Sequence, residues 1–218
     1  MSKNYSTVLF DLDGTLTDSS SGIFNCVKHA LTSLGLEIPN DTTLNKFLGP
    51  PLIHSFKEFC GLDEDTAREA VRLYRQRYET VLTEENALYD GIEDMLKRLT
   101  DTGVTAAVAT SKPEKYAVRI LEGFGIRRYF KAVCGADPDD GKTEKAHLIK
   151  KALEQCGVTD LGTAVMVGDR SYDIEGAKSA GIASVGALYG YGSRAELEEA
   201  GADYIASKPN EIVKIILK

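Results

Sequence analysis

Beyond residue 90 the chain alternates short apolar runs with longer amphipathic segments, and this alternation limits the folds that it can adopt. The apolar runs cover residues 104–110, 130–136, 163–169, 182–188 and 202–207. Each run is followed by a segment with the apolar spacing of a helix. Strands that are apolar on both faces and alternate with helices are typical of a parallel sheet between helical layers. We therefore expect an α/β fold with a Rossmann-like parallel sheet, whose first strand is residues 8–10.

Residues 20–86 do not follow this alternation of strand and helix patterns. The stretches SGIFNCVKHALTSLG, LIHSFKEFCG and EDTAREAVRLYRQRYETVL all have helical spacing, and no strand pattern separates them. Helices inserted directly after the first strand indicate a separate small domain. We expect an α-helical cap domain at residues 19–87, and an α/β core domain made of residues 1–18 and 88–218.

Charge and cysteine usage exclude several classes of partner. The 218 residues include 26 Lys and Arg against 33 Asp and Glu, and the net charge is −7. An acidic chain without a basic run is a poor candidate for binding nucleic acid or an acidic membrane. The four cysteines form no CxxC pair, which is typical of reduced thiols in a cytoplasmic protein. The start MSKNYSTVLF is too polar for a signal peptide, and no apolar run reaches the roughly 18 residues of a membrane span. We expect a cytoplasmic protein with no nucleic-acid or membrane partner, and the oligomeric state stays open.

Polar side chains follow the expected strands at the points where the strands end. Asp11 and Asp13 come directly after the first strand, in VLFDLDGTLTDS, and residues two apart on a strand share a face. Two neighbouring carboxylates repel each other unless a cation lies between them. Because the carboxyl ends of parallel strands meet at one edge of a sheet, other polar side chains are expected beside this pair. These are Thr15, Thr110, Ser111, Lys112, Asp137, Asp139, Asp140, Lys142, Lys145, Asp169 and Asp173.

These residue types suit phosphoryl transfer. Clustered carboxylates with few histidines favour a hard divalent cation, above all Mg²⁺. Hydroxyl and ammonium groups bind phosphate. An aspartate can be a nucleophile toward phosphorus while a second carboxylate acts as general acid and base. The cation and a lysine would neutralise the charge that develops during transfer.

Three motifs resemble those of the haloacid dehalogenase-like superfamily, and the resemblance covers essentially the whole chain. DLDGTLTDS is similar to the first motif of that family, ATSK to the second and VGDRSYDIEGAKSAG to the fourth. Within the family the chain most resembles the phosphoglycolate phosphatase-like members with a helical cap, including 5′-nucleotidases. This resemblance implies a phosphoric monoester hydrolase that acts on a small phosphorylated metabolite, with the cap choosing among leaving groups.

The resemblance also implies a role for each acidic motif residue. Asp11 is expected to be the nucleophile that forms an aspartyl-phosphate. Asp13 is expected to protonate the leaving oxygen and then to activate water. The Asp11 side chain, the Asp13 carbonyl and Asp169 are expected to hold Mg²⁺, and Asp173 is expected to complete the metal site.

The second and third motifs are expected to bind the phosphate. By resemblance, Thr110 and the main-chain N–H of Ser111 contact phosphate oxygens. The third motif departs from the simplest family pattern, because DDGKTEKAHLIKKAL offers two lysines. Lys145, which opens the helical pattern, is the expected catalytic and phosphate-binding lysine, and Lys142 stays open as the alternative.

Two further segments have weaker functional signals. In relatives, the segment that matches KFLGPPL, residues 46–52, faces the substrate, so Phe47 and Gly49 are expected substrate-binding residues. The same segment can instead be a rigid turn between cap helices. The glycine-rich LYGYGS, residues 188–193, lacks the GK[ST] that follows a nucleotide-binding loop, and its role stays open.

Other functions use the same residue types. Phosphoglycolate is the leading substrate by resemblance, and a nucleoside monophosphate, with Phe47 or Tyr191 stacked on the base, is the nearest alternative. A β-phosphoglucomutase-like phosphomutase would share the motifs, although Thr15 is the residue type associated with the phosphatases of the family that the chain resembles. A receiver-like phosphoacceptor module also combines Asp, Thr or Ser, and Lys on a parallel sheet. The helical insert, the paired aspartates of the first motif and Asp173 argue against that module.

Overall fold

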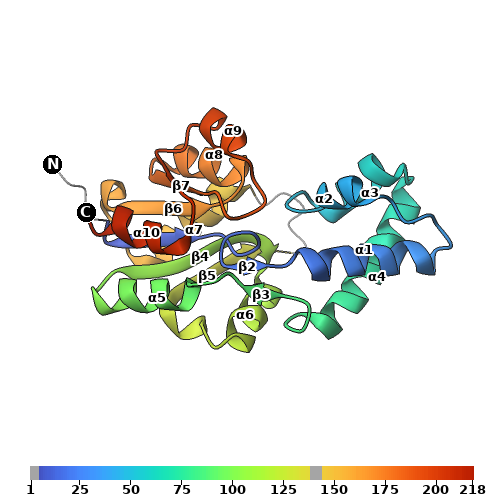
Figure 1. Ribbon diagram of the computed structural model, residues 1–218, viewed down its shortest axis with the longest axis horizontal. Helices are drawn as coiled ribbons and strands as arrows, with labels where there is room; N and C mark the ends of the chain where they lie inside the picture. Colours follow the sequence, from blue (N-terminus) through green and yellow to red (C-terminus); the bar gives the residue numbers. More distant parts are fainter. Residues whose placement is uncertain (1–4, 138–143) are drawn as a thin grey trace. The chain divides into compact units, whose positions relative to one another are not determined.

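The computed structural model describes residues 5–137 and 144–218. The chain divides into two compact units, one made of Met1–Asp18 and Leu88–Lys218 and the other of Ser19–Ala87 (Figure 1). Within the described residues, no helix combines the length and the apolar character that a membrane crossing needs. Lys142, the alternative lysine of the third motif, lies outside the described residues, as do Asp139 and Asp140.

The larger unit is built on a six-stranded sheet in which all paired neighbours are parallel. The strand order across the sheet is β5-β4-β1-β6-β7-β8. The strands are β1 (Thr7–Phe10), β4 (Thr105–Pro113), β5 (Phe130–Ala136), β6 (Ala164–Gly168), β7 (Ala183–Ala187) and β8 (Tyr204–Ala206). The predicted α/β class with a parallel sheet is therefore confirmed.

Strand register brings the expected site residues to one edge. All four residues of β1 are buried, as a central strand with helices on both faces requires. Phe10, the last residue of β1, is paired with Val108 of β4 on one side and Val167 of β6 on the other. Thr110 and Asp169 each follow two residues after these partners. Both residues therefore lie near Asp11 along the strand direction, at the same edge of the sheet.

Helices cover the sheet and bury its apolar side chains. They are α5 (Ile92–Asp101), α6 (Glu114–Gly123), α7 (Lys145–Cys156), α8 (Ser171–Ala180), α9 (Arg194–Glu199) and α10 (Pro209–Ile216), with 3-10 turns at Arg127–Tyr129 and Leu161–Thr163. Leu9, Ala107 and Met166 of the central strands belong to one apolar cluster with residues of α7 and α8. Neighbouring residues on a strand face opposite ways, so the adjacent strand residues point to the other layer. In that layer α5 and α10 pack against each other (Figure 1).

The smaller unit is helical. Its helices are α1 (Ser20–Ser33), α2 (Asp41–Asn45), α3 (Leu52–Cys60) and α4 (Glu64–Val81). Asn40 and Asp63 begin α2 and α4 as caps, because their side chains accept the N–H of the residue three positions later. Near the end of the unit, the Arg77 guanidinium forms two hydrogen bonds with the Glu85 carboxylate, at 2.5 and 2.7 Å. The short α2 is the one helix of this unit that the sequence pattern does not predict.

A second sheet forms where the chain passes between the units. It pairs β2 (Thr17–Asp18) with β3 (Ala87–Leu88). Just beyond it, the N–H of Tyr89 donates to the carbonyl of Leu16 at 3.2 Å. The outgoing and returning connections of the larger unit are therefore hydrogen-bonded to each other.

Candidate active site

The loop after β1 is a tight turn that carries Asp11 and Asp13. The N–H of Asp11 still donates to a carbonyl of β6, at 2.9 Å, so the residue continues the line of the strand. The Leu12 carbonyl then accepts the N–H groups of the three residues that follow Gly14, at 2.9–3.2 Å. Gly14 has a φ of 84°, and a Cβ at this position would lie 2.2 Å from Asp169 Oδ2. The turn therefore needs glycine both for its backbone and for the close approach of the aspartate.

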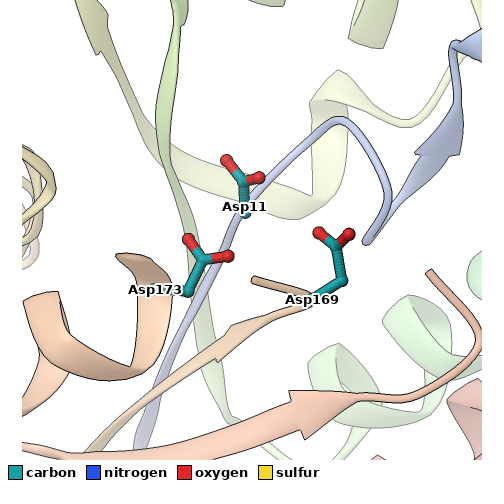
Figure 2. Close-up of side chains that lie close together, drawn as sticks. All are labelled: Asp11, Asp169 and Asp173. Atoms are coloured by element: carbon teal, nitrogen blue, oxygen red, sulfur yellow. The ribbon is translucent and has the colours of Figure 1, made fainter. Parts of the chain in front are cut away.

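Three carboxylates meet beyond the ends of β1 and β6. Asp11, Asp169 and Asp173 lie side by side, and each offers an oxygen within 4.8 Å of the others (Figure 2). Asp169 and Asp173 are almost fully buried, with 0% and 1% of their surface exposed. Burial and the charges of Asp173 and Asp11 raise the pKa of Asp169 well above its usual value. Three carboxylate oxygens at this spacing fit a hard divalent cation, which would relieve their repulsion.

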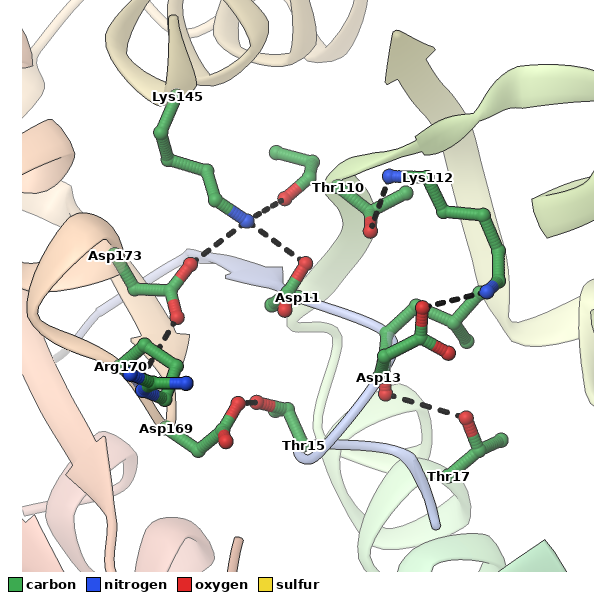
Figure 3. Close-up of polar contacts among 12 residues, drawn as sticks. Asp11, Asp13, Thr15, Thr17, Thr110, Lys112, Lys145, Asp169, Arg170 and Asp173 are labelled. Carbon is green, nitrogen blue, oxygen red and sulfur yellow. Dashed lines mark hydrogen bonds and ion pairs between the residues drawn. The ribbon is translucent and has the colours of Figure 1, made fainter. Parts of the chain in front are cut away.

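A buried lysine joins two of these carboxylates. Lys145 is the first residue of α7, and its Nζ lies 2.7 Å from both Asp11 Oδ1 and Asp173 Oδ1 (Figure 3). A third contact, at 3.2 Å, is with the carbonyl of Ala109 in β4. Burial disfavours the ammonium form, but the two carboxylates outweigh burial and raise the pKa of Lys145. The ammonium group therefore stays charged beside Asp11.

A glycine of α8 makes room for the lysine stem. A Cβ at Gly176 would lie 2.8 Å from Cγ and 3.0 Å from Cβ of Lys145. Those atoms belong to the fixed part of the side chain, so a larger residue at position 176 would displace Lys145. In the sequence Gly176 is one glycine of the fourth motif, and its residue type alone does not indicate that it makes room for Lys145.

Asp13 is held by a second lysine that the motif assignment left without a role. Lys112 Nζ lies 2.6 Å from Asp13 Oδ2, and the lysine side chain is only 8% exposed (Figure 3). The other oxygen, Asp13 Oδ1, is buried and has no hydrogen-bond partner among the described residues. One oxygen is thus held in an ion pair while the other keeps its hydrogen-bonding capacity for a proton donor or acceptor, which is the arrangement that general acid and base catalysis needs.

The second motif lies at the end of β4, in an irregular part of the strand. The pairing of β4 with β5 shifts register between Thr110 and Pro113. Thr110 is buried, and its Oγ1 accepts the N–H of Lys112 at 3.3 Å, whereas Ser111 is exposed. The predicted phosphate-binding pair is therefore at the same strand end as the Lys145 contact to Ala109.

Both oxygens of Asp169 have hydrogen-bond donors. Thr15 Oγ1 donates to Oδ1 at 3.1 Å, and the N–H of Tyr191 donates to Oδ2 at 2.9 Å. Asp173 is held in turn by the N–H of Arg170, which donates to its Oδ2 at 3.1 Å at the start of α8. The orientation of the metal-ligand candidates is thus set by groups from three different loops.

The expected substrate residues of the smaller unit have contrasting environments. Phe47 is 2% exposed, and its ring packs edge to face against Phe56 and Phe59, with centroids 5.2 and 5.7 Å apart. Gly49 is exposed and has a φ of 110°. Packing of the Phe47 ring inside its own unit weighs against stacking on a nucleoside base, and the substrate-binding roles of both residues stay predictions.

The sequence does not indicate the roles of three residues in this site. Lys112, predicted only as a polar strand-end residue, pairs with Asp13, and Tyr191, predicted only as a residue that could stack on a base, contributes through its main-chain N–H. Gly176, for which the sequence predicts no role, contributes by lacking a side chain. A main-chain donor has no residue-type signature, so the contact of Tyr191 with Asp169 has no signal in the sequence. The lysine of ATSK was visible as a charged residue beside the predicted phosphate ligands.

Comparison with known proteins agrees with this geometry. Residues 8–187 match the haloacid dehalogenase-like hydrolase family. A 5′-nucleotidase of Pseudomonas aeruginosa is 42% identical over 193 residues, which are 88% of this chain and 87% of that protein. The tyrosine-protein kinase PtkA of Mycobacterium tuberculosis is also 42% identical, over 185 residues and 85% of this chain, but the match spans only 62% of that protein. A phosphoglycolate phosphatase of Vibrio parahaemolyticus is 29% identical over 217 residues, 96% of this chain and 95% of that protein.

A crystal structure described as a predicted phosphatase from Clostridium acetobutylicum shares the fold. Its TM-score is 0.90 at 43% identity, and the match covers 98% of this chain and 99% of that one. The family match runs from β1 to the end of β7 and includes all three motifs noticed in the sequence. The protein is therefore a member of the haloacid dehalogenase-like hydrolase family, as its motifs predicted.

Proposed function

We propose that the protein is a Mg²⁺-dependent phosphatase that hydrolyses small phosphomonoesters through an aspartyl-phosphate on Asp11. The observation that carries this proposal is the shared lysine: Lys145 contacts Asp11 and Asp173 together, beside a cluster of three carboxylates. A nucleophilic carboxylate, a fixed cation and a site for a second cation are what phosphoryl transfer requires.

In the first half of the reaction a carboxylate oxygen of Asp11 attacks phosphorus, and the bond to the leaving oxygen breaks. Lys145 orients Asp11 through its contact with Oδ1 and neutralises charge on the transferring group. Asp13 gives a proton to the leaving oxygen through Oδ1, which no hydrogen bond from the described residues occupies, while Lys112 holds the other oxygen in place. Thr110 and the Ser111 N–H bind phosphate oxygens in this proposal.

In the second half water attacks the aspartyl-phosphate, and Asp13 takes the proton from that water. Asp11 is regenerated and inorganic phosphate leaves. Asp11, the Asp13 carbonyl and Asp169 would hold Mg²⁺ with support from Asp173. The chemistry supplied by the bound ion is positive charge that reduces repulsion between the anionic nucleophile and the phosphate.

The direct test is the turnover of p-nitrophenyl phosphate with and without Mg²⁺. We expect turnover in Mg²⁺ and its loss in EDTA, because three crowded carboxylates would otherwise repel the phosphate. Ca²⁺ should inhibit, since its longer and less rigid coordination misplaces the nucleophile. Undiminished turnover in metal-free buffer would reject the metal assignment. A receiver-like module would accept phosphate without sustained turnover.

The metal-free protein should become less stable as the pH rises. Burial, opposed only in part by Lys145, raises the pKa of Asp173 to about 6, and burial also raises that of Asp169. Such groups bind protons more tightly in the folded chain, so their contribution is complete below about pH 3.9 and is lost as the pH rises through the folded pKa. We expect the unfolding temperature in EDTA to fall by several degrees between about pH 5 and pH 7.5, and Mg²⁺ to restore it.

The matched variant for this measurement is Asp169→Asn, which cannot titrate at that position. Its unfolding temperature should fall less steeply over the same pH range, and Mg²⁺ should restore less of it. Equal slopes for the variant and the unmodified protein would show that Asp169 does not contribute to the pH dependence of the metal-free stability.

Phosphoglycolate and nucleoside monophosphates are the substrate classes to separate. The 42% identity to a 5′-nucleotidase supports a nucleotide. The ammonium of Lys112 beside Asp13 supports a carboxylate on the leaving group, because the leaving oxygen departs next to Asp13. Comparison of kcat/KM for phosphoglycolate, nucleoside monophosphates, hexose phosphates and a phosphotyrosine peptide tests both. A preference for the peptide would reject a small substrate. A separate assay should measure phosphate transfer from ATP to tyrosine, which is the activity in the name of PtkA.

Lys112→Met sharpens that comparison. If the leaving group carries a carboxylate, the loss of a charge-assisted contact should raise KM for phosphoglycolate roughly 10- to 100-fold and leave KM for nucleoside monophosphates nearly unchanged. Lys115→Met is the control, since Lys115 is an exposed residue of α6 whose Nζ lies over the Tyr116 ring. Equal effects on KM for both substrates would show that Lys112 supports Asp13 and does not bind a carboxylate of the leaving group.

A further inference from the structure

The glycine-rich segment 188–193 lies between β7 and α9 and has no part in the mechanism above. We call it the tyrosine loop, after Tyr189 and Tyr191. The whole segment belongs to the larger unit. Its contacts reach both the candidate metal ligands and the two chain connections, and this double attachment suggests a function for it.

On one side the tyrosine loop holds Asp169. The Tyr191 N–H donates to Asp169 Oδ2 at 2.9 Å. The Tyr189 hydroxyl donates to the Thr15 carbonyl at 3.0 Å, and the Thr15 hydroxyl donates to Asp169 Oδ1 at 3.1 Å. Both oxygens of this carboxylate are therefore oriented by the loop, one directly and one through Thr15.

The two glycines of the loop are required by this close approach. A Cβ at Gly190 would lie 2.2 Å from the Gly14 carbonyl oxygen and 2.4 Å from Asp169 Cβ, and one at Gly192 would lie 1.9 Å from the Asp169 carbonyl oxygen. Neither glycine has a positive φ, so the requirement is for space rather than for backbone freedom. The spacing of glycines in YGYG is thus explained by packing against the metal-ligand segment.

On the other side the tyrosine loop contacts both chain connections. The Tyr191 hydroxyl lies 3.2 Å from Asp18 Oδ1, and Asp18 is the last residue of the larger unit before the chain leaves it. The Tyr189 ring packs edge to face against Tyr89, with centroids 5.2 Å apart, and Tyr89 follows directly after the returning strand β3. One residue, Tyr191, thus contacts a candidate metal ligand with its main chain and the outgoing connection with its side chain.

We propose that Tyr191 is a positioning residue which couples metal binding at Asp169 to the order of the two chain connections. This inference rests on the metal site of the proposed function. Metal binding needs the Asp169 oxygens held in one orientation. The contact of the Tyr191 hydroxyl with Asp18 fixes the position of Tyr191, so that the Tyr191 N–H stays hydrogen-bonded to Asp169. Coupling of this kind is reciprocal, so a bound ion also orders the connections.

The test is Tyr191→Phe, which removes the hydroxyl and leaves the main-chain N–H. Calorimetric titration with Mg²⁺ should give a dissociation constant about 2- to 10-fold higher than in the unmodified protein, as expected for one lost hydrogen bond. Hydrogen exchange at residues 16–19 and 87–91 should slow on Mg²⁺ addition in the unmodified protein and change much less in the variant. Tyr204→Phe is the control, because Tyr204 lies on β8 and its hydroxyl accepts a long 3.4 Å contact from Tyr5.

A double-mutant cycle with Asp18→Ala then asks whether the effect runs through Asp18. The effects of Tyr191→Phe and Asp18→Ala on the Mg²⁺ dissociation constant should not add, because both remove the same contact. Additive effects, or an unchanged dissociation constant in Tyr191→Phe, would overturn the coupling while leaving the metal site in place. Failure of the unmodified protein to bind Mg²⁺ would instead reject the metal site, and the coupling with it.

Discussion

Asp11→Asn is expected to abolish turnover, with a loss of at least ~10⁴-fold in kcat, while the fold survives. An amide has the shape of the carboxylate but is not a competent nucleophile toward phosphorus. The substitution should be tolerated structurally because Lys145 keeps its second carboxylate partner, Asp173, at 2.7 Å. Steady-state release of phosphate measures the loss, and circular dichroism with thermal unfolding checks the fold.

Comparison with Asp13→Asn separates the nucleophile from the acid and base. General acid and base catalysis contributes roughly 10²–10⁴-fold, so Asp13→Asn should also be severely impaired. p-Nitrophenolate leaves without protonation, so this variant should still release a stoichiometric burst of p-nitrophenolate as the aspartyl-phosphate accumulates, and Asp11→Asn should show none. Asp11→Ala guards against slow reversion of the Asn side chain to Asp. Near-native rates in either Asp11 variant would refute covalent catalysis at this residue.

Lys145→Met is expected to produce the second large effect, a loss of roughly 10²–10³-fold in kcat/KM. The variant keeps much of the stem that packs against Gly176 but removes the ammonium group. Asp11 and Asp173 would then be left as buried carboxylates without their shared cation, which should cost about 3–5 kcal/mol of stability. Kinetic and thermal measurements at saturating Mg²⁺ separate the two losses, because the added ion partly replaces the missing charge.

Two other lysines serve as comparisons for this result. Lys150→Met removes an exposed lysine from the same helix and should change neither rate nor stability by much. Lys142→Met tests the alternative that the third motif left open. A greater loss of activity in Lys142→Met than in Lys145→Met would move the phosphate-binding role to Lys142.

The sheet was largely predictable because its strands are buried on both faces. The run 130–136 coincides with β5, and the run 182–188 contains β7 with one extra residue at each end. The continuation of β4 from Ser111 to Pro113 was not predicted, because SKP has no apolar pattern and the strand changes register there. The strands β2 and β3 have two residues each, too few to show any periodicity.

The acidic residues of the site were predictable from their positions after strands, whereas their supporting contacts were not. Asp11, Asp169 and Asp173 follow buried runs or open the next helix, and the topology of a parallel sheet brings such positions together. The ion pair of Lys112 with Asp13 depends on side-chain direction across the turn after β1, which no spacing rule supplies. The burial of Phe47 among aromatic rings depends on which face of the turn points inward, and an aromatic residue is compatible with either face.

The strand order has a consequence for how the protein folds. β1 precedes the other described strands of this sheet in the chain, yet it lies inside the sheet and pairs with β4 and β6, which begin at residues 105 and 164. Its apolar side chains can therefore be buried only after residues that are distant along the chain have been synthesised. Such non-local parallel pairing is intrinsically slow. The smaller unit, continuous in sequence from Ser19 to Ala87, has no such delay. An elongating chain would thus complete its helical unit well before Asp11 acquires the neighbours that make it reactive, so partly synthesised chains should lack phosphatase activity.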